Sequence, residues 1–362
     1  MIVYENLRKV NEPFFDEYKK SFSDILDGGW YILGGAVKSF EAEFAEYCGA
    51  QYCVGVASGL DALILALRVY GFKPGTEVIV PSNTYIATIL SILHCGLKPV
   101  LVEPDIETYN IDPNRIEEAI TPKTTAIMVV HLYGKMCDMD SIIRIAKRYN
   151  LKIIEDCAQA HGSRYKEKKA GTCGECGAFS FYPTKNLGAL GDAGAVITND
   201  PDLAEKLRMF RNYGSKVKNY NEVIGYNSRL DEVQAGFLSV KLKKLDDINN
   251  HKRKLASIYL DKIGADFVKP VISEDYYDTY HIFNIRHPER DRLKKYLMDR
   301  GIGTDIHYSV PPHKQKAMNG MFDGRDYPVS DEIHATTLSL PISYGHDEKN
   351  IHGVIERLNG FH

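Results

Sequence analysis

Several features that would assign the chain to a special class of protein are missing from its 362 residues. No apolar run approaches the roughly 18 residues of a membrane-spanning helix, so we expect no membrane segment. The first 15 residues lack a basic stretch followed by a long apolar one, so we expect no signal peptide. Lys and Arg (45) nearly balance Asp and Glu (48), and this net charge of −3 gives no electrostatic reason to expect nucleic-acid binding.

Cysteine is also sparse. The seven cysteines are scattered and odd in number, which is typical of reduced thiols in the cytoplasm. The only close pair is Cys173 and Cys176. A structural zinc site would need a second pair, and a redox Cys-x-x-Cys motif normally opens a helix, whereas glycines surround this pair. We therefore expect a cytoplasmic protein without a metal site.

What the sequence does contain is an alternation of apolar strands and amphipathic helices. Strands are expected over 52–58, 76–81, 98–103, 125–130 and 151–156, with helices over 59–71, 87–96, 112–120 and 138–150. This alternation predicts an α/β protein with a mostly parallel central sheet covered on both faces. Two further strands, over 177–182 and 193–200, are joined by a loop rather than by a full helix.

The second half of the chain changes in character. One long amphipathic helix is expected over 231–260, and the remainder mixes shorter strands and helices. We expect this long helix to bridge two domains. The predicted division is a large domain over residues 1–245 and a smaller C-terminal α+β domain over residues 246–362.

Two charged residues occupy positions suited to catalysis. Lys185 lies among apolar and glycine residues in the loop before the last predicted strand of the large domain. Apolar surroundings lower the pKa of a lysine, and a Schiff base forms only from the neutral amine. Asp156 ends the fifth strand, at the edge where open α/β sheets bind ligands. For each residue taken alone, the alternative is structural: Lys185 as a surface-loop lysine and Asp156 as a helix-capping or loop aspartate.

Further residues fit a phosphorylated aromatic ligand. Ser58 and Gly59 join the first strand to a helix, whose N-terminal N–H groups suit a phosphate, and Ser180 adds a hydroxyl. Tyr85 follows the second strand, where its ring can stack on a flat ligand. Together with the lysine and the aspartate, these residues describe pyridoxal 5′-phosphate (PLP), which bonds covalently to a lysine and pairs its ring nitrogen with an acid.

Long motifs strengthen this interpretation. The segments 155–171, 177–196 and 225–235 closely resemble the DegT/DnrJ/EryC1 family of nucleotide-sugar aminotransferases, as do 29–49 and 301–313. The resemblance runs nearly end to end. It implies the PLP-dependent aspartate-aminotransferase fold (fold type I) and a homodimer with active sites at the subunit interface.

The resemblance also implies a role for each matching residue. Lys185 matches the family's Schiff-base lysine, Asp156 the partner of the pyridine nitrogen, and Gln159 the residue that hydrogen-bonds the phenolic oxygen of PLP. The remaining matches are the phosphate-binding Ser58, Gly59 and Ser180, the stacking Tyr85, and Asn227, which matches a residue that reaches the phosphate from a second subunit.

The substrate is also suggested by resemblance. Residues 83–113 look most like enzymes that aminate C-3 of dTDP-3-keto-6-deoxyhexoses with L-glutamate, which becomes 2-oxoglutarate, in the biosynthesis of O-antigens or other polysaccharides. A C-4 aminotransferase acting on an NDP-4-keto-6-deoxysugar is the alternative. Candidate diphosphate ligands are charged residues of the run 211–221 and Arg229. The candidate substrate-binding residues are Tyr31, His161, Tyr182, Arg229, His307 and Tyr308.

Three other classes of protein are alternatives. An amino-acid aminotransferase would usually carry an arginine that binds the α-carboxylate bidentately; no arginine can be singled out for this role, so the sequence does not decide on this class. A regulatory protein that keeps only the fold is disfavoured by the intact Lys185 and Asp156. A nicotinamide-dependent dehydrogenase needs a G-x-G-x-x-G turn after its first strand, and residues 57–63 do not supply one.

Overall fold

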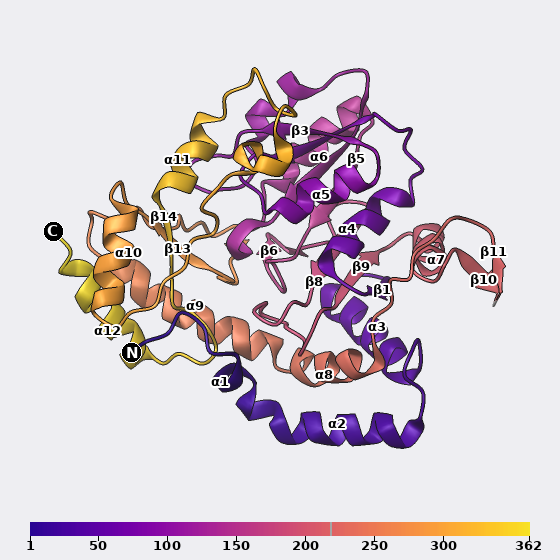
Figure 1. Cartoon of the computed structure of the whole chain (residues 1–362), viewed down its shortest axis with the longest axis horizontal. Coiled ribbons are helices and arrows are strands. Elements are labelled where there is room, and N and C mark those ends of the chain that lie inside the picture. Colours follow the sequence, from indigo (N-terminus) through magenta and orange to yellow (C-terminus); the bar gives the residue numbers. More distant parts are fainter. Residues whose placement is uncertain (218) are drawn as a thin grey trace.

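A computed structural model describes residues 1–217 and 219–362 of the chain. Its larger part is built on a seven-stranded sheet with the strand order β1-β9-β8-β5-β4-β2-β3 (Figure 1). Strand β9 runs antiparallel to both of its neighbours, and the other pairs are parallel. The strands are β1 (Tyr52–Val56), β2 (Glu77–Pro81), β3 (Lys98–Val102), β4 (Thr124–Val130), β5 (Lys152–Asp156), β8 (Cys176–Ser180) and β9 (Gly194–Thr198). The predicted mostly parallel sheet is confirmed.

Both faces of this sheet are buried, because successive side chains of a strand point to opposite sides. On β2, Ile79 packs into one core while Val78 and Val80 pack into the other. Helices α3 (Gly35–Cys48), α6 (Met139–Tyr149) and α8 (Glu232–Leu242) contribute to the first core, and helices α4 (Gly59–Arg68), α5 (Ile86–His94) and α7 (Pro201–Phe210) to the second. The sheet is therefore the middle layer of three.

Two predicted helices differ in the structure. The helix expected over 112–120 is a pair of short 3₁₀ turns, η2 (Pro113–Arg115) and η3 (Glu117–Ala119). The long helix expected over 231–260 is broken into α8 and α9 (Leu245–Lys262). The break lies between Leu242 and Leu245, which both pack into the first core.

The smaller part of the molecule has its own core. The antiparallel pair β13 (Phe283–Arg286) and β14 (Thr337–Leu340) packs against α9, α10 (Arg290–Asp299) and α12 (Glu348–Asn359). Helix α9 also contributes Leu245 to the core of the large part. It therefore connects the two parts, as the sequence predicted for this stretch, and Figure 1 shows it running from one to the other.

The remaining elements lie around these two cores. The short strands β6 (Arg164–Tyr165), β7 (Lys168–Lys169) and β12 (Tyr276–Tyr277) form a three-stranded sheet, and β10 (Ser215–Val217) and β11 (Tyr220–Asn221) form a projecting hairpin. The other helical elements are α1 (Leu7–Asn11), η1 (Glu12–Phe14), α2 (Phe15–Gly28), η4 (Leu132–Gly134), η5 (Pro312–Lys314), η6 (Lys316–Met318) and α11 (Pro328–Thr336). Among the described residues, no helix combines the length and the apolar character needed to cross a bilayer.

The first residues of the chain contact the smaller part rather than the larger one. Ile2 forms a β-bridge with Ile302, and its carbonyl oxygen accepts a hydrogen bond from the N–H of Gly303. The carbonyl of Val3 lies 2.9 Å from Nε2 of His346. The domain boundary at residue 245 stays a prediction. The first residues fall by sequence in the predicted large domain, but they contact the smaller part.

Candidate active site

A cavity of about 490 Å³ opens at the carboxyl edge of the parallel strands. Its size lies within the range of small-molecule binding sites. It is formed by the N-terminus of α4, by the loops that follow β2, β5 and β8, and by loops of the smaller part. The predicted residues that line it are Ser58, Gly59, Tyr85, Asp156, Gln159, Ser180, Tyr182, Lys185, His307 and Tyr308. Residues from widely separated parts of the sequence therefore meet where the strand pattern predicted a ligand.

Lys185 lies on a tight turn that follows β8. Its backbone N–H donates to the carbonyl of Tyr182 at 2.8 Å, and its side chain is partly exposed to the cavity. Burial lowers the pKa of the amine to about 8, and the negative charge of Asp156 opposes this shift. A substantial fraction of the amine is therefore neutral near physiological pH, as a nucleophilic lysine requires.

Asp156 is held in place by two hydrogen bonds and is only 6% exposed. Its Oδ1 accepts from the N–H of Ala158 at 3.1 Å, and its Oδ2 from the hydroxyl of Thr88 at 2.9 Å. Burial raises the pKa of this carboxyl, whereas the two hydrogen bonds and the charge of Lys185 lower it. A protonated ring nitrogen placed beside such a carboxylate would replace part of its lost hydration.

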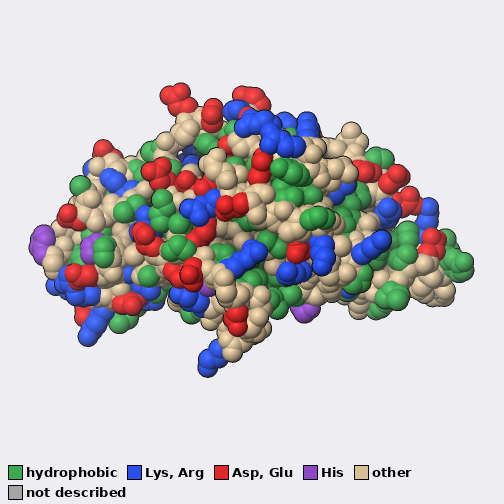
Figure 2. Space-filling view, turned by 90° about the horizontal axis from the view of Figure 1, so that it is seen from above, with side chains coloured by type: hydrophobic (Ala, Val, Ile, Leu, Met, Phe, Trp, Pro, Cys, Tyr) green, Lys and Arg blue, Asp and Glu red, His purple; other side chains and the backbone are tan. Residues whose placement is uncertain are grey.

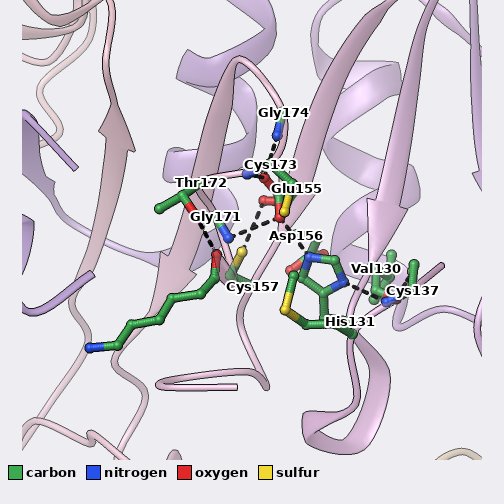
Figure 3. A network of polar contacts seen from close by, with 12 residues as sticks. Val130, His131, Cys137, Glu155, Asp156, Cys157, Gly171, Thr172, Cys173 and Gly174 are labelled. Carbon is green, nitrogen blue, oxygen red and sulfur yellow. Dashed lines mark hydrogen bonds and ion pairs between the residues drawn. The ribbon is translucent and has the colours of Figure 1, made fainter. Parts of the chain in front are cut away.

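The residue before Asp156 anchors this end of β5 in the core. Glu155 has no exposed surface, yet its carboxylate accepts four hydrogen bonds, and these lower its pKa against the effect of burial (Figure 3). The donors are Nε2 of His131 (2.8 Å) and the N–H groups of Gly171 (2.9 Å), Cys173 (2.7 Å) and Gly174 (2.6 Å). The N–H of His131 also donates to the carbonyl of Asp156 at 3.1 Å.

The same network includes a potential metal-binding cluster of His131, Glu155 and Cys157, whose ligand atoms lie within 4.8 Å of one another. Nδ1 of His131 accepts from the N–H of Cys137 at 3.1 Å, so the ring proton lies on Nε2 and points to Glu155. Burial raises the pKa of the Cys157 thiol well above its usual value. We therefore interpret the cluster as a structural anchor, since its ligand atoms are already hydrogen-bonded or protonated.

The residues predicted to bind phosphate converge on the N-terminus of α4. Ser58 is the N-cap of this helix, and its Oγ accepts from the N–H of Asp61 at 3.1 Å. A Cβ on Gly59 would lie 2.4 Å from Cβ of Ser180, so only glycine allows the helix end to approach the hydroxyl of Ser180 this closely. Free helical N–H groups, the positive end of the helix dipole and a hydroxyl together suit an anion.

Aromatic and amide groups form the wall beside Lys185. The rings of Tyr85 and Tyr308 lie 5.0 Å apart. Gln159 donates from Nε2 to the hydroxyl of Tyr308 at 2.9 Å and accepts the N–H of Tyr133 at 2.7 Å on Oε1. One N–H of the Gln159 amide remains for a ligand oxygen, because a primary amide has two. The residues present therefore fit PLP.

His161 does not reach the cavity, which corrects its prediction as a substrate ligand. Its ring is 1% exposed and lies 5.5 and 5.6 Å from the rings of Phe179 and Phe181. Burial lowers its pKa to about 3, so the ring is neutral. The turn after Asp156 directs Gln159 to the cavity but turns His161, two residues later, into the core.

Three other predicted residues lie away from the cavity of their own chain. Asn227 and Tyr31 are exposed. Arg229 donates to Oδ1 of Asn212 at 3.1 Å and lies 5.3 Å from the centre of the Tyr213 ring. These positions are compatible with a site completed by another subunit, which a single chain does not test.

Two charged residues of the run 211–221 form ion pairs with other side chains of the chain. Arg211 is buried and forms an ion pair with Glu41, so it is not a ligand for a substrate diphosphate. Lys216 pairs with Glu205 on the surface. Lys218, the remaining cation of this run, lies outside the described residues.

The sequence analysis missed several residues of the site. Thr88 bonds to Asp156 from one helical turn beyond Tyr85, a spacing that places residues on the same face of a helix. This spacing was a usable signal. Thr184 and His281 also line the cavity. His281 comes from the smaller part, nearly 100 residues away from Lys185, and no local pattern marks it.

One cavity brings together a lysine whose pKa is lowered, a buried carboxylate and the N-terminus of a helix. It lies at the edge of an α/β sheet that has helices on both faces. These features define a PLP-dependent enzyme of fold type I. The chain belongs to the DegT/DnrJ/EryC1/StrS aminotransferase family, whose model matches residues 15–359. Both the fold class and the cofactor predicted from the sequence are thereby confirmed.

Individual relatives agree with this assignment. The chain is 53% identical over its full length to the dTDP-3-amino-3,6-dideoxy-α-D-galactopyranose transaminase of Aneurinibacillus thermoaerophilus, of which it covers 99%. Its structure is similar to that of DesV from S. venezuelae in complex with a ketimine intermediate, with a TM-score of 0.97, 44% identity and coverage of 99% and 98% of the two chains. It is also similar to NtdA from Bacillus subtilis with bound cofactor PMP, with a TM-score of 0.92, 32% identity and coverage of 99% and 84%.

Proposed function

We propose that the chain transfers the amino group of L-glutamate to C-3 of a dTDP-3-keto-6-deoxyhexose, with PLP as cofactor. The products are the dTDP-3-amino-3,6-dideoxyhexose and 2-oxoglutarate. One observation carries the proposal: Lys185 and Asp156 line one cavity in a chain that is 53% identical, end to end, to a transaminase named for a dTDP-3-amino sugar. The free thiols of its cysteines are compatible with a cytoplasmic enzyme of deoxysugar biosynthesis.

Lys185 is the proposed acid and base of this reaction. When bound, PLP supplies an aldehyde that carries the amino group and an aromatic ring that accepts electrons. Lys185 would hold the aldehyde carbon and, once the donor displaces it, take up and return the proton of the reacting carbon. With a pKa of about 8 instead of 10.5, the neutral fraction of the amine at pH 7.5 rises roughly 200-fold. Asp156 would keep the ring nitrogen protonated.

The other cavity residues would bind and orient. Ser58, Gly59 and Ser180 would hold the phosphate, Tyr85 would stack on the ring, and Gln159 would donate its remaining N–H to the phenolic oxygen. These roles follow from the donors and surfaces that the residues offer to the cavity.

Tyr182, His307 and Tyr308 are the proposed sugar-binding residues. Nδ1 of His307 lies 2.8 Å from Oγ of Ser339, which fixes the ring. Burial lowers the pKa of His307 to about 4, so the ring is neutral at pH 7 and offers Nε2 to a sugar hydroxyl without adding a charge.

The position that receives the amino group is tested by product analysis. The protein is incubated with PLP, L-glutamate and dTDP-4-keto-6-deoxyglucose, with and without a 3,4-ketoisomerase. We expect an aminosugar only when the isomerase is present, with nitrogen at C-3 by NMR. Amination at C-4 without the isomerase would instead identify the chain as a C-4 aminotransferase and overturn the proposal.

We further propose a homodimer with shared active sites. Apolar side chains are exposed on and beside the β10–β11 hairpin, including Val217 (65%), Tyr220 (67%) and Ile224 (95%). Figure 2 shows hydrophobic side chains gathered at the end of the molecule where this hairpin lies. Exposed apolar clusters of this kind favour a protein interface. Asn227 lies near the hairpin and away from its own cavity, so its predicted role requires a second subunit.

Mixing two inactive variants tests the shared site. In a hybrid of Lys185→Ala and Asn227→Ala subunits, one site would combine an intact Lys185 with an intact Asn227 only if Asn227 acts across the interface. We expect the mixture to recover PLP retention and activity that neither variant has alone. No recovery in hybrids shown to exchange subunits would overturn a role of Asn227 in the neighbouring site.

A further inference from the structure

A buried lysine that the proposed reaction does not use lies behind Lys185. Lys252, on α9, is 4% exposed. Its amine donates to Oδ1 of Asn186 at 2.9 Å and to the carbonyl of His281 at 3.0 Å. Asn186 is the next residue after Lys185 in the chain, and His281 lines the cavity. Lys252 therefore connects helix α9 to two walls of the active site.

Asn249 extends this connection from the preceding turn of α9. Its Oδ1 accepts a hydrogen bond from Nδ2 of Asn186 at 2.8 Å, and its Nδ2 donates one to the carbonyl of His161 at 2.9 Å. Residues three apart on a helix lie on the same face, so Asn249 and Lys252 hold Asn186 between them. Both are fully or almost fully buried. The loop that carries Lys185 and the turn that follows Asp156 are thus fastened to one helix.

Lys252 also differs from most buried lysines, which pair with a carboxylate. Its hydrogen bonds go to an amide and a carbonyl instead. The charged and titratable groups that face it are Glu5 in the N-terminal segment, Lys241 on α8, Lys185, His281, and His346 of the smaller part. Burial lowers its pKa to about 8, with further lowering by Lys241 and Lys185 against the opposing charge of Glu5.

We propose that Lys252 is a positioning residue for the aminotransferase site: it holds Lys185 toward the cavity through its hydrogen bonds to Asn186 and to the carbonyl of His281. The inference rests on the proposed role of Lys185. It is tested by two measurements, the reactivity of the Lys185 amine without PLP and the rate at which PLP attaches to it.

The first measurement is made on the full chain without added PLP. Acetic anhydride labelling at pH 7.5, followed by mass analysis of the Lys185 peptide, reports how readily this amine reacts. We expect labelling of Lys185 to fall in Lys252→Met, because the amine is no longer held toward the cavity, and to fall less in Lys252→Gln. Labelling identical to that of the wild type in Lys252→Met would overturn the proposal.

The second measurement is the rate at which added PLP forms a borohydride-reducible bond to Lys185, located by peptide mass. We expect Lys252→Met to slow this attachment about tenfold, because Asn186 and His281 lose their donor. Lys252→Gln should slow it about threefold, since an amide restores one donor without the charge.

Lys241→Met is the matched control. Lys241 is 1% exposed, and burial lowers its pKa to about 8 as well, but its contacts to Asn11 and to the carbonyl of Gly188 are both 3.4 Å long. We expect less than a twofold change in attachment. Equal slowing in Lys241→Met and Lys252→Met would mean that the loss of either buried lysine loosens the structure in the same way. That result would overturn the proposal.

Two further outcomes are decisive. If Lys252→Met fails to fold by circular dichroism, Lys252→Gln carries the test, and attachment at the wild-type rate in that variant overturns the proposal. If PLP attaches to another lysine in the wild type, the proposed catalytic role of Lys185 fails first. The labelling experiment would still report on Lys252 in that case, so the two failures are distinguishable.

Discussion

Two buried polar clusters adjoin residues of the cavity, and they differ in how they affect the charge of their members. Beneath Asp156, the carboxylate of Glu155 is surrounded by four donors, and its pKa is lowered despite complete burial. Behind Lys185, the amines of Lys241 and Lys252 have amide and carbonyl partners, and burial lowers the pKa of each to about 8.

The difference matches what each side of the site must do. An acid opposite a pyridinium must stay ionised, and Thr88 and Ala158 supply donors to Asp156 although burial raises its pKa. An amine that acts as a nucleophile and base must lose its proton, and burial lowers the pKa of Lys185 although the charge of Asp156 opposes this shift. We infer that the acid side is built to keep a charge and the amine side to release one.

Removing the amine itself is the largest perturbation of this contrast. We expect Lys185→Ala to lower glutamate-dependent formation of 2-oxoglutarate by at least about 10³-fold, because both the covalent anchor and the proton-transferring group are lost. Stopped-flow or coupled assays at saturating PLP measure this loss. Turnover within tenfold of the wild type would contradict the role of Lys185.

The second-largest expected effect comes from removing the charge of Asp156. We expect Asp156→Asn to lower kcat by about 10²-fold to 10³-fold while the protein still binds PLP, because an amide stabilises a protonated ring nitrogen poorly. Asp278→Asn is the control, since Asp278 is as buried as Asp156 and its pKa is also raised by burial, but it pairs with Lys135 outside this cavity. The control should lose stability and keep its kcat within about twofold. Equal losses of kcat would contradict the assignment.

The two sides were not equally predictable from sequence. Asp156 and Ser58 follow strands whose apolar pattern is local, and Lys185 stands out from its immediate neighbours, so the fold and the principal site residues follow from short segments. Thr88 bonds to a residue 68 positions away, and Lys252 to one 66 positions away. Such contacts depend on how helices pack on the sheet. The spacing of Tyr85 and Thr88 indicates a shared helix face, but no local pattern identifies the partner of Thr88 or of Lys252.

His161 illustrates the same limit. It lies two residues after Gln159 and was a candidate substrate-binding residue. The direction of a side chain in a turn depends on backbone angles that the residue types do not fix, and here the ring packs between Phe179 and Phe181. The break between α8 and α9 was missed for a related reason, because amphipathic periodicity continues across it.

A third prediction tests the acid side for stability rather than catalysis. We expect Glu155→Gln to lower the free energy of unfolding by about 3 kcal/mol, because three N–H donors and His131 would lose a charged acceptor in a buried site. Glu175→Gln is the control: its Oε2 accepts one backbone N–H, from Ile153, and its side chain is one-third exposed. Urea unfolding at pH 7 should show a loss below about 1 kcal/mol for the control. Similar losses in both variants would contradict a large contribution of the Glu155 hydrogen bonds to the free energy of unfolding.

The smallest expected effect is a gain in the free energy of unfolding, and it concerns Lys241 on the amine side. Lys241 has a folded-state pKa of about 8 and a usual value of 10.5. The unfolded chain therefore binds more protons between these two pH values, and this group makes stability rise with pH across that window. Replacing it with Met removes the cost of burying an ammonium, on the order of 3 kcal/mol at pH 7.5, but also removes two long hydrogen bonds and their packing.

We therefore expect Lys241→Met to be about 1 kcal/mol more stable than the wild type at pH 7.5 and to lose this advantage by pH 9.5. Urea unfolding at both pH values measures it. The range stops at pH 9.5 because buried tyrosines such as Tyr18, whose pKa is raised, lower stability at higher pH. A variant that is less stable by the same amount at both pH values would mean that the buried amine is well accommodated as a cation. The amine side would then keep charge as the acid side does, and the contrast between the two clusters would be lost.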